Sequence, residues 1–347
     1  MKLDPAFVWQ NYAIVTLALF CLVALSTAFS LVFGHLVRRL DVNDVPDGNR
    51  KRQAEPVSRL GGVAMLGSLT AMAPLAIFFV DGPVITFHFP LIVLTGTMFL
   101  VGLGDDFLTL PSLPKLVLML AGCVAAAYFG LYPETLQSPF GSVTMDAILI
   151  IGSIAWLLVF TNSANFMDGA NGLAIGSLAV MLTGLAYIGT IEGSFPLLAV
   201  WLTLLGAIIG FLIHNLRGKL YAGDAGSLGL GALFASLGLV SGLQVWTVAT
   251  LALPFLIDVL MTLIWRAKHG RPWLKPHLDH AYQKLRLSGW SHIETSFLYW
   301  GLSTVCAVAA VIAAKSGGDA PFFVFWGLCL SGIALWSIHR RGQSVEI

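Results

Sequence analysis

Eleven apolar runs, most of them close to twenty residues long, limit what this chain can fold into. A helix needs roughly 20 mostly apolar residues to cross the hydrocarbon core of a bilayer. Since 57% of the residues are hydrophobic and only 11% are charged, the composition is not that of a soluble globular protein. We therefore predict an all-α, polytopic membrane bundle of about eleven transmembrane helices. The runs cover approximately residues 11–34, 60–80, 84–103, 114–131, 144–164, 172–190, 195–214, 227–243, 246–266, 296–314 and 321–338.

The connections between the runs are too short to hold a second hydrophobic core. Residues 1–347 are therefore predicted to form a single membrane-embedded domain. The first run is longer than a signal-peptide core and no small-residue cleavage site follows it, which favours a retained span. The four cysteines lie singly within apolar runs, and we interpret them as packing residues.

The basic residues are distributed unevenly between the two sides of the predicted bundle. If successive connections alternate sides, 17 of the 19 Lys and Arg residues fall on one side, with only Lys2 and Lys315 on the other. Because basic residues concentrate in cytoplasmic loops, this split predicts an outside N-terminus and a cytoplasmic C-terminus. The 17 residues are Arg38, Arg39, Arg50, Lys51, Arg52, Arg59, Lys115, Arg217, Lys219, Arg266, Lys268, Arg271, Lys275, Lys284, Arg286, Arg340 and Arg341.

Four polar islands interrupt the apolar pattern, and all of them lie on this basic side. They are residues 102–106, 161–172, 221–227 and 276–283. We predict that the four islands converge into one site at the membrane interface. The active-site face is expected to comprise the cytoplasmic loops at about residues 35–59, 104–113, 165–171, 215–226 and 267–295.

The first two islands carry carboxylates where helices end. Asp105 and Asp106 close the third run, and carboxylates at a helix C-terminus oppose the helix dipole unless a cation is near. This cost favours a functional role over a merely solvated helix end. In the second island Asn165 and Asp168 are three residues apart, which places both side chains on one face if the helix persists. An ordinary Asn/Gly turn is the alternative interpretation.

The third island is a glycine-rich turn before a helix. Gly223, Asp224 and Gly226 are typical of a turn whose backbone N–H groups bind an anion, although an aspartate at a helix N-cap explains the same pattern. Just upstream, Arg217 and Lys219 suit either contacts with phosphate oxygens or anchoring at the bilayer surface.

Histidines mark the fourth island. His277 and His280 flank Asp279, but no cysteine or third ligand stands nearby, which disfavours structural zinc. Aspartates elsewhere in the chain suit Mg²⁺ and phosphate groups better, and the imidazoles would then position a phosphate or stabilise transferred charge. Exposed loop histidines are the alternative. Asp258, deep in the ninth run, indicates either a functional site or a structural pair with a polar neighbour.

In their order along the chain, these segments resemble the motif set of the polyprenyl-phosphate N-acetylhexosamine-1-phosphate transferases, within glycosyltransferase family 4. This superfamily contains the lipid I-forming transferase and the enzymes that initiate O-antigen, common-antigen and teichoic-acid synthesis. Each motif alone is weakly specific, whereas four in sequence between residue 56 and about residue 285 are strongly specific. The matching segments are Pro56-Val-Ser-Arg59-Leu-Gly61-Gly62, Asp105-Asp106 with Lys115, Asn165-Phe-Met-Asp168-Gly169, Gly223-Asp224-Ala-Gly226-Ser227 and His277-x-x-His280-Ala-Tyr-Gln283.

The resemblance implies a Mg²⁺-dependent transfer of N-acetylhexosamine 1-phosphate from a UDP-sugar to undecaprenyl phosphate, with release of UMP and with Mn²⁺ as a substitute metal. Direct attack by the lipid and a route through a phosphorylated aspartate both remain open. The metal ligands it implies are Asp168 and Asp224. The catalytic residues it implies are Asp105, Asp106, Asp168, His277 and His280. The substrate-binding residues it implies are Arg59, Lys115, Asn165, Asn171, Gly223, Gly226, Arg217 and Lys219.

The spaced histidines and the eleventh run depart from the ten-span plan of the lipid I-forming enzyme. They favour the branch that initiates O-antigen or related polysaccharides, with UDP-GlcNAc or a 6-deoxy UDP-N-acetylhexosamine as donor. The expected location is the bacterial inner membrane, with the active site on the cytoplasmic face. The bilayer is an expected partner and nucleic acid is not, and a helical bundle of this kind is compatible with a homodimer.

Two other function classes remain open. A transporter of lipid-linked or sugar substrates predicts ionisable residues near the bilayer centre and repeat symmetry between halves, and Asp258 alone fits that pattern. A membrane phosphatase or pyrophosphatase acting on polyprenyl diphosphate would use similar metal chemistry, but its Arg-rich phosphate motif is not evident.

Overall fold

The computed structural model of the chain describes residues 12–40, 42–46, 55–78, 89–191, 198–273 and 275–343. In these ranges it contains twelve α-helices and one two-stranded hairpin. Nine of the helices are long and apolar enough to cross a membrane, and two shorter apolar helices, Gly61–Ala76 and Ser112–Tyr128, account for the remaining predicted runs. The prediction of an all-α, polytopic membrane bundle is therefore confirmed.

Apart from one short helix at residues 281–287, which matches no predicted run, the helices begin and end within about five residues of the predicted runs. They are α2 (Tyr12–Val37), α3 (Gly61–Phe78), α5 (Phe89–Leu108), α6 (Ser112–Tyr128), α7 (Asp146–Phe166), α8 (Leu173–Ile191), α9 (Leu198–Asn215), α10 (Gly223–Val240), α11 (Val245–Lys268), α12 (Ala281–Leu287), α13 (His292–Ser316) and α14 (Ala320–Gln343).

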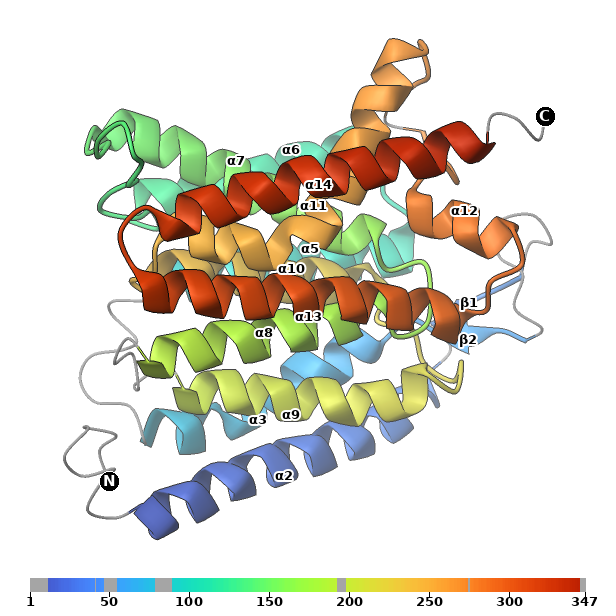
Figure 1. Cartoon of the computed structure of the whole chain (residues 1–347). Helices are drawn as coiled ribbons and strands as arrows, with labels where there is room; N and C mark the ends of the chain where they lie inside the picture. Colours follow the sequence, from blue (N-terminus) through green and yellow to red (C-terminus); the bar gives the residue numbers. More distant parts are fainter. Residues whose placement is uncertain are drawn as a thin grey trace.

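The long helices lie roughly side by side, and β1, β2 and α12 gather at one end of the bundle (Figure 1). Because successive spanning helices alternate in direction, the last turns of α5, α7 and α9 meet the first turns of α6, α8 and α10 at that end. We refer to it as the hairpin end. The hairpin itself pairs β1 (Asn43–Asp44) with β2 (Val57–Ser58), in the antiparallel register Asn43 to Ser58 and Asp44 to Val57. Strands of two residues are too short to leave a periodic signal in the sequence.

Helix α10 is the central element of the bundle. It packs most extensively against α5 and also contacts α7, α3 and α8, and most of its residues are buried. Its sequence is rich in Gly, Ala and Ser, and small residues let helix backbones approach closely. At Gly226 a Cβ atom would lie 2.9 Å from the Cα of Gly62, so this packing requires glycine on both helices. The first turn of α10 is thereby fixed between α3 and α5.

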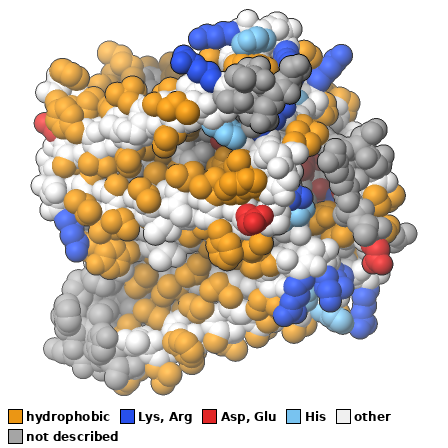
Figure 2. Space-filling model, turned by 45° about the vertical axis from the view of Figure 1, so that its right-hand side comes forward, with side chains coloured by type: hydrophobic (Ala, Val, Ile, Leu, Met, Phe, Trp, Pro, Cys, Tyr) orange, Lys and Arg blue, Asp and Glu red, His pale blue; other side chains and the backbone are white. Residues whose placement is uncertain are grey.

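The basic residues keep the uneven distribution that the sequence predicts. Lys2, Arg50, Lys51 and Arg52 lie outside the described residues, as does part of the predicted loop at 35–59. The other members of the basic set belong to segments at the hairpin end, whereas Lys315 lies in the last turn of α13 at the opposite end. Figure 2 shows Lys and Arg side chains gathered along the top and at the lower right of the view, with a further basic side chain at the left edge. Which membrane side this end faces stays a prediction.

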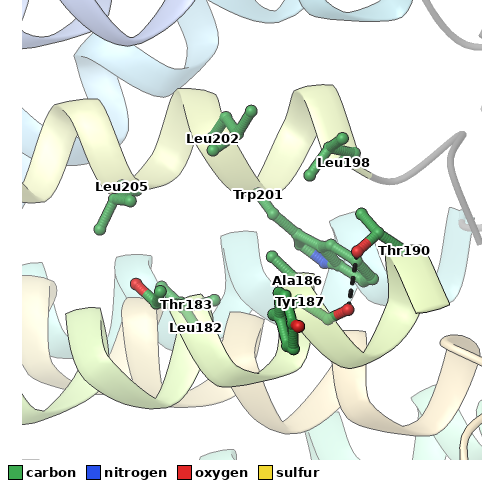
Figure 3. Close-up of a pocket in the computed structure, with 9 residues that line it drawn as sticks. All are labelled: Leu182, Thr183, Ala186, Tyr187, Thr190, Leu198, Trp201, Leu202 and Leu205. Atoms are coloured by element: carbon green, nitrogen blue, oxygen red, sulfur yellow. Dashed lines mark hydrogen bonds between the residues drawn. The ribbon is translucent and has the colours of Figure 1, made fainter. Parts of the chain in front are cut away.

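An apolar cavity of about 210 Å³ lies between α8 and α9, near the end of the bundle away from the hairpin. Figure 3 shows Trp201 reaching from α9 toward Tyr187 and Thr190 of α8, where the Thr190 hydroxyl donates to the carbonyl oxygen of Tyr187 over 2.7 Å. The lining consists mainly of leucine, alanine, threonine and aromatic side chains. The lining that the structure describes contains no Asp, Glu, His, Lys or Cys side chain, whereas the clustered aspartates lie at the opposite, hairpin end of the bundle.

Candidate active site

Four charged residues at the hairpin end form a cluster that joins α5, α6 and α10. This aspartate–lysine cluster consists of Asp105, Asp106, Lys115 and Asp224. The Lys115 ammonium donates to Oδ2 of Asp105 over 3.0 Å and forms an ion pair with Asp224. The other oxygen of Asp105 accepts from the backbone N–H of Leu110 over 2.6 Å. The first and third polar islands therefore meet, and Lys115 supplies positive charge to both.

Within this cluster, Asp106 binds the backbone at the start of α10. Its two oxygens accept hydrogen bonds from the N–H groups of Asp224, over 2.9 Å, and Ala225, over 3.0 Å. These two N–H groups therefore bind Asp106, while the anion contacts expected at Gly223 and Gly226 stay a prediction. Gly223 is required for another reason, since its φ is +69° and a Cβ atom would lie 2.2 Å from the carbonyl oxygen of Arg59. The geometry makes Asp106 a positioning residue for Asp224.

The second island reaches the same cluster from the end of α7. The amide of Asn165 donates to the Ser227 hydroxyl of α10 over 2.8 Å and lies within hydrogen-bonding reach of the Asp224 carboxylate. Asp168 follows in the turn after α7. Among the described residues none donates a hydrogen bond to its carboxylate, and the charges of Asp224 and Asp106 act on it. Burial, together with these two negative charges, raises the pKa of Asp168 well above its usual value.

These carboxylates fit a divalent cation that also binds substrate. Asp168 and the cluster present four aspartates against one lysine, so negative charge is in excess, and it adds to burial in raising the pKa of Asp168. Among the described residues, no three His, Cys, Asp or Glu side chains form a ready-made metal centre. Mg²⁺ needs only one or two protein carboxylates, because substrate phosphates and water complete its coordination. Asp168 and Asp224 can supply those two carboxylates.

Helices α9 and α13 hold the turn that carries Asp168. The backbone N–H of Asn171 donates to His292 Nδ1 over 3.1 Å, and the hydroxyl of Ser296 donates to the Asn171 carbonyl over 2.7 Å. The N–H of Gly172 donates to Oδ1 of Asn215 over 2.6 Å, and Nδ2 of Asn215 donates to the Leu220 carbonyl over 2.8 Å. Buried Asn215 therefore ties the turn carrying Asp168 to the loop that leads to Asp224.

The fourth island packs against the end of α7, beside the turn with Asp168. The His280 ring stacks on Phe166, with ring centroids 5.7 Å apart, and His277 lies 4.9 Å from His280 by the same measure. The Tyr282 hydroxyl donates to the Phe166 carbonyl over 2.9 Å. At Gly169 a Cβ atom would lie 2.1 Å from that hydroxyl, so a side chain there would displace the contact. Contacts therefore link the second island to the fourth.

Burial, together with the neighbouring His280 and Arg266, lowers the pKa of His277 to about 4. Its imidazole is therefore neutral near pH 7, which suits hydrogen bonding to a phosphate better than stabilisation of transferred charge by a cation.

Buried Asp258 of α11 lies beneath this loop. It accepts hydrogen bonds from the N–H groups of Ala281, over 2.7 Å, and Tyr282, over 3.2 Å. Of the two roles considered for Asp258, the contacts match the structural one.

Three predicted basic contacts lie around the cluster rather than within it. Arg59 forms an ion pair with Asp44 of β1, although its charge still acts on Asp106. Arg217 and Lys219 are exposed in the turn after α9. These positions leave all three at the hairpin end, where an anionic substrate would approach.

Sequence reasoning missed Asn215 and Tyr299, two residues that help to hold the site together. Asn215 interrupts the end of an apolar run, and the Tyr299 hydroxyl, inside another run, donates to Asp258 over 2.6 Å. A polar group within an apolar span is costly unless it is paired, so its position was the signal that could have identified each of them.

Comparison with known proteins agrees with this geometry. Residues 88–242, which carry the aspartate–lysine cluster and the turn with Asp168, match the family model described as glycosyl transferase family 4. The phospho-N-acetylmuramoyl-pentapeptide-transferase of Streptococcus pneumoniae strain 70585 is 30% identical over an alignment of 228 residues that covers 60% of this chain and 70% of the relative. That of strain Hungary19A-6 is 29% identical over the same shares. The chain therefore belongs to glycosyl transferase family 4.

Proposed function

We propose that this membrane protein transfers an N-acetylhexosamine 1-phosphate unit from a UDP-sugar to undecaprenyl phosphate and releases UMP. The observation that carries the proposal is the contact network that joins all four polar islands at one end of an apolar bundle. At such a place a water-soluble donor arrives from the aqueous side and a lipid phosphate arrives from the bilayer. The family membership and the distant relationship to the pneumococcal transferases support this class of reaction.

In this reaction an oxygen of the lipid phosphate attacks the β-phosphorus of the UDP-sugar. A new P–O bond forms, the bond from that phosphorus to the UMP oxygen breaks, and UMP leaves. Both reactants are anions, so the protein must hold them in place and offset their charge. Lys115 supplies a positive charge to the cluster. Asp105, which Lys115 and the Leu110 N–H hold, is our candidate for the group that keeps the lipid phosphate ionised.

Mg²⁺ is the cofactor that fits these residues, with Asp168 and Asp224 as its protein ligands and with Mn²⁺ as a substitute. When bound there, it would neutralise phosphate oxygens of the substrates. The neutral imidazole of His277 and the stacked ring of His280 would orient the donor phosphates from the other side of the turn.

The predicted orientation places this site on the cytoplasmic face of a bacterial inner membrane. The spaced histidines and the eleventh apolar run, which forms α14, favour the branch that initiates O-antigen or a related surface polysaccharide. On this proposal the donor is UDP-GlcNAc or a 6-deoxy UDP-N-acetylhexosamine. The transporter alternative loses its main support, because Asp258 binds the start of α12 instead of lining a path through the bundle.

The test of this function measures UMP release by the purified protein from UDP-GlcNAc and from 6-deoxy UDP-N-acetylhexosamines. We expect UMP only when undecaprenyl phosphate and Mg²⁺ are both present, together with a lipid diphosphate sugar detected by mass spectrometry. UMP formed without the lipid acceptor would contradict the proposal and indicate hydrolysis. If no donor yields UMP while the lipid acceptor is intact, the transferase assignment fails and transport is tested next.

Metal binding should depend on pH because the pKa of Asp168 is raised. A carboxylate must lose its proton to bind Mg²⁺, so we expect the affinity for Mg²⁺ to increase with pH until the raised pKa of Asp168 is passed and to level off above it. Calorimetry in buffers of different ionisation enthalpy should detect protons released on binding. Asp168→Asn should abolish that release, and the absence of any release in the unaltered protein would contradict the assignment of Asp168 as a ligand.

A further inference from the structure

Helix α14 contributes little to the core of the bundle. No described residue of α14 belongs to the hydrophobic core, and Leu330, Leu335 and Ile338 are largely exposed. Its first turns pack against α11, where Phe322 and Trp326 surround Trp246. Because so few residues of α14 are buried, core packing alone does not account for its position in the bundle. The polar contacts at its other end help to account for that position.

The last turn of α14 binds the loop that carries the histidines. Nη1 of Arg340 donates to the carbonyl oxygen of Asp279 over 2.9 Å, and Nη2 lies 3.7 Å from the Asp279 carboxylate. The guanidinium group also lies 3.8 Å from the centroid of the Trp265 ring on α11. Arg340 therefore contacts both the loop and the helix beneath it.

Asp279 is the residue through which this contact reaches the site. It lies between His277 and His280, it is 5% exposed, and its N–H donates to His277 Nδ1 over 3.3 Å. Its carboxylate also forms an ion pair with buried Arg266 of α11. Because a buried carboxylate with several cationic partners has little freedom, its position fixes the two histidines on either side.

We propose that Arg340 is a positioning residue for transfer, which holds the loop at residues 277–280 against the end of α7 through Asp279. The proposal rests on the proposed function for its kinetic consequence, but not for its structural one. On this proposal α14, the eleventh apolar run, helps to orient the donor in addition to any role as an anchor in the bilayer.

Loss of the contact should loosen the loop without unfolding the protein. In Arg340→Ala, Asp279 keeps Arg266, so the buried carboxylate stays paired. Small displacements of groups that position a substrate can lower rates by about a hundredfold. We therefore expect kcat/KM for the UDP-sugar to fall by about tenfold to a hundredfold, with a higher KM for the donor and an unchanged KM for undecaprenyl phosphate.

The experiment compares Arg340→Ala and Arg340→Lys with Arg341→Ala, which removes the adjacent and exposed arginine of the same helix. Lysine keeps the charge but lacks the planar fork that bonds the loop and stacks on Trp265, so it should recover only part of the activity. Hydrogen–deuterium exchange measures the loop directly. Exchange of residues 275–283 should be faster in Arg340→Ala and unchanged in Arg341→Ala, while residues 221–225 and 167–172 keep their rates.

Two results would overturn the proposal. One is an Arg340→Ala protein that matches Arg341→Ala in both donor kinetics and loop exchange. The other is faster exchange throughout the chain, which would indicate general destabilisation instead of a local contact. If the unaltered protein transfers no sugar phosphate, the proposed function fails, and loop exchange alone still decides whether Arg340 holds the loop.

Discussion

Replacement of Asp168 by asparagine should lower the rate of UMP release by roughly a thousandfold, equivalent to about 4 kcal/mol of transition-state stabilisation. Asparagine keeps the size of the side chain and one oxygen but loses the negative charge. If Asp168 holds a metal ion between the substrate phosphates and the protein, that charge is what the reaction needs. Steady-state kinetics at saturating Mg²⁺ measure the effect.

The same substitution should leave the substrate-free protein at least as stable as the parent. Asp168 accepts no hydrogen bond from the described residues, while Asp224 and Asp106 repel its charge. A neutral amide removes this repulsion, so activity and stability should change in opposite directions, as expected for a functional residue under electrostatic strain. A variant that loses activity because it misfolds would show lower stability, and that outcome would contradict the assignment.

The pH dependence of stability provides an independent check. The folded-state pKa of Asp168 lies above the unfolded value of about 3.9. Between these two pKa values the unfolded chain loses the Asp168 proton while the folded protein keeps it. The free energy of unfolding therefore falls as pH rises from about 3.9 to the folded pKa. Asp168→Asn should lack this loss of stability, and Mg²⁺ should reverse it only in the parent. Asp146→Asn, which alters an exposed aspartate at the other end of α7, is the matched control.

The arrangement of helices could be predicted from the sequence because each span carries its own signal. Apolar length locates a spanning helix without knowledge of its neighbours. Boundaries were less certain where polar residues extend a helix. Helix α13 begins at His292 and not near residue 296, because Ser291 and Glu294 form a capping box ahead of the apolar run.

The convergence of the polar islands was predictable, whereas their contacts were not. Alternating helices bring ends on the same side together, and that rule places all four islands at one end of the bundle. No local pattern indicates that Asp106 binds the N–H of Asp224, a residue 118 positions later in the chain. That pairing depends on the close packing of α5 and α10, which glycine residues permit but do not specify.

The sequence also left the role of Asp258 open, and the structure gives a sharp expectation for it. Its carboxylate joins three helices. Besides the N–H groups of Ala281 and Tyr282, it accepts the Tyr299 hydroxyl over 2.6 Å and the Thr262 hydroxyl over 3.3 Å. A single buried carboxylate thus satisfies donors from α11, α12 and α13, and it fixes the start of the helix that follows His280.

Asp258→Ala should therefore cost more stability than any other substitution considered for this protein. It leaves two backbone N–H groups and the Tyr299 hydroxyl without their acceptor, and each unsatisfied buried donor costs about 1–3 kcal/mol. We expect the free energy of unfolding to fall by roughly 3–5 kcal/mol. Unfolding in detergent micelles, followed by tryptophan fluorescence, measures the change.

Asp258→Asn separates the charge of the side chain from its shape. The amide keeps one acceptor oxygen but directs an NH₂ group at donors. We therefore expect Asp258→Asn to be less stable than the parent and more stable than Asp258→Ala. Tyr299→Phe removes one of the donors, so its effect should be smaller in the Asp258→Ala background than in the parent. Asp146→Ala should unfold like the parent. Equal stability of Asp258→Ala and Asp146→Ala would show that the carboxylate does not hold α12, and the positions of His277 and His280 would need another explanation.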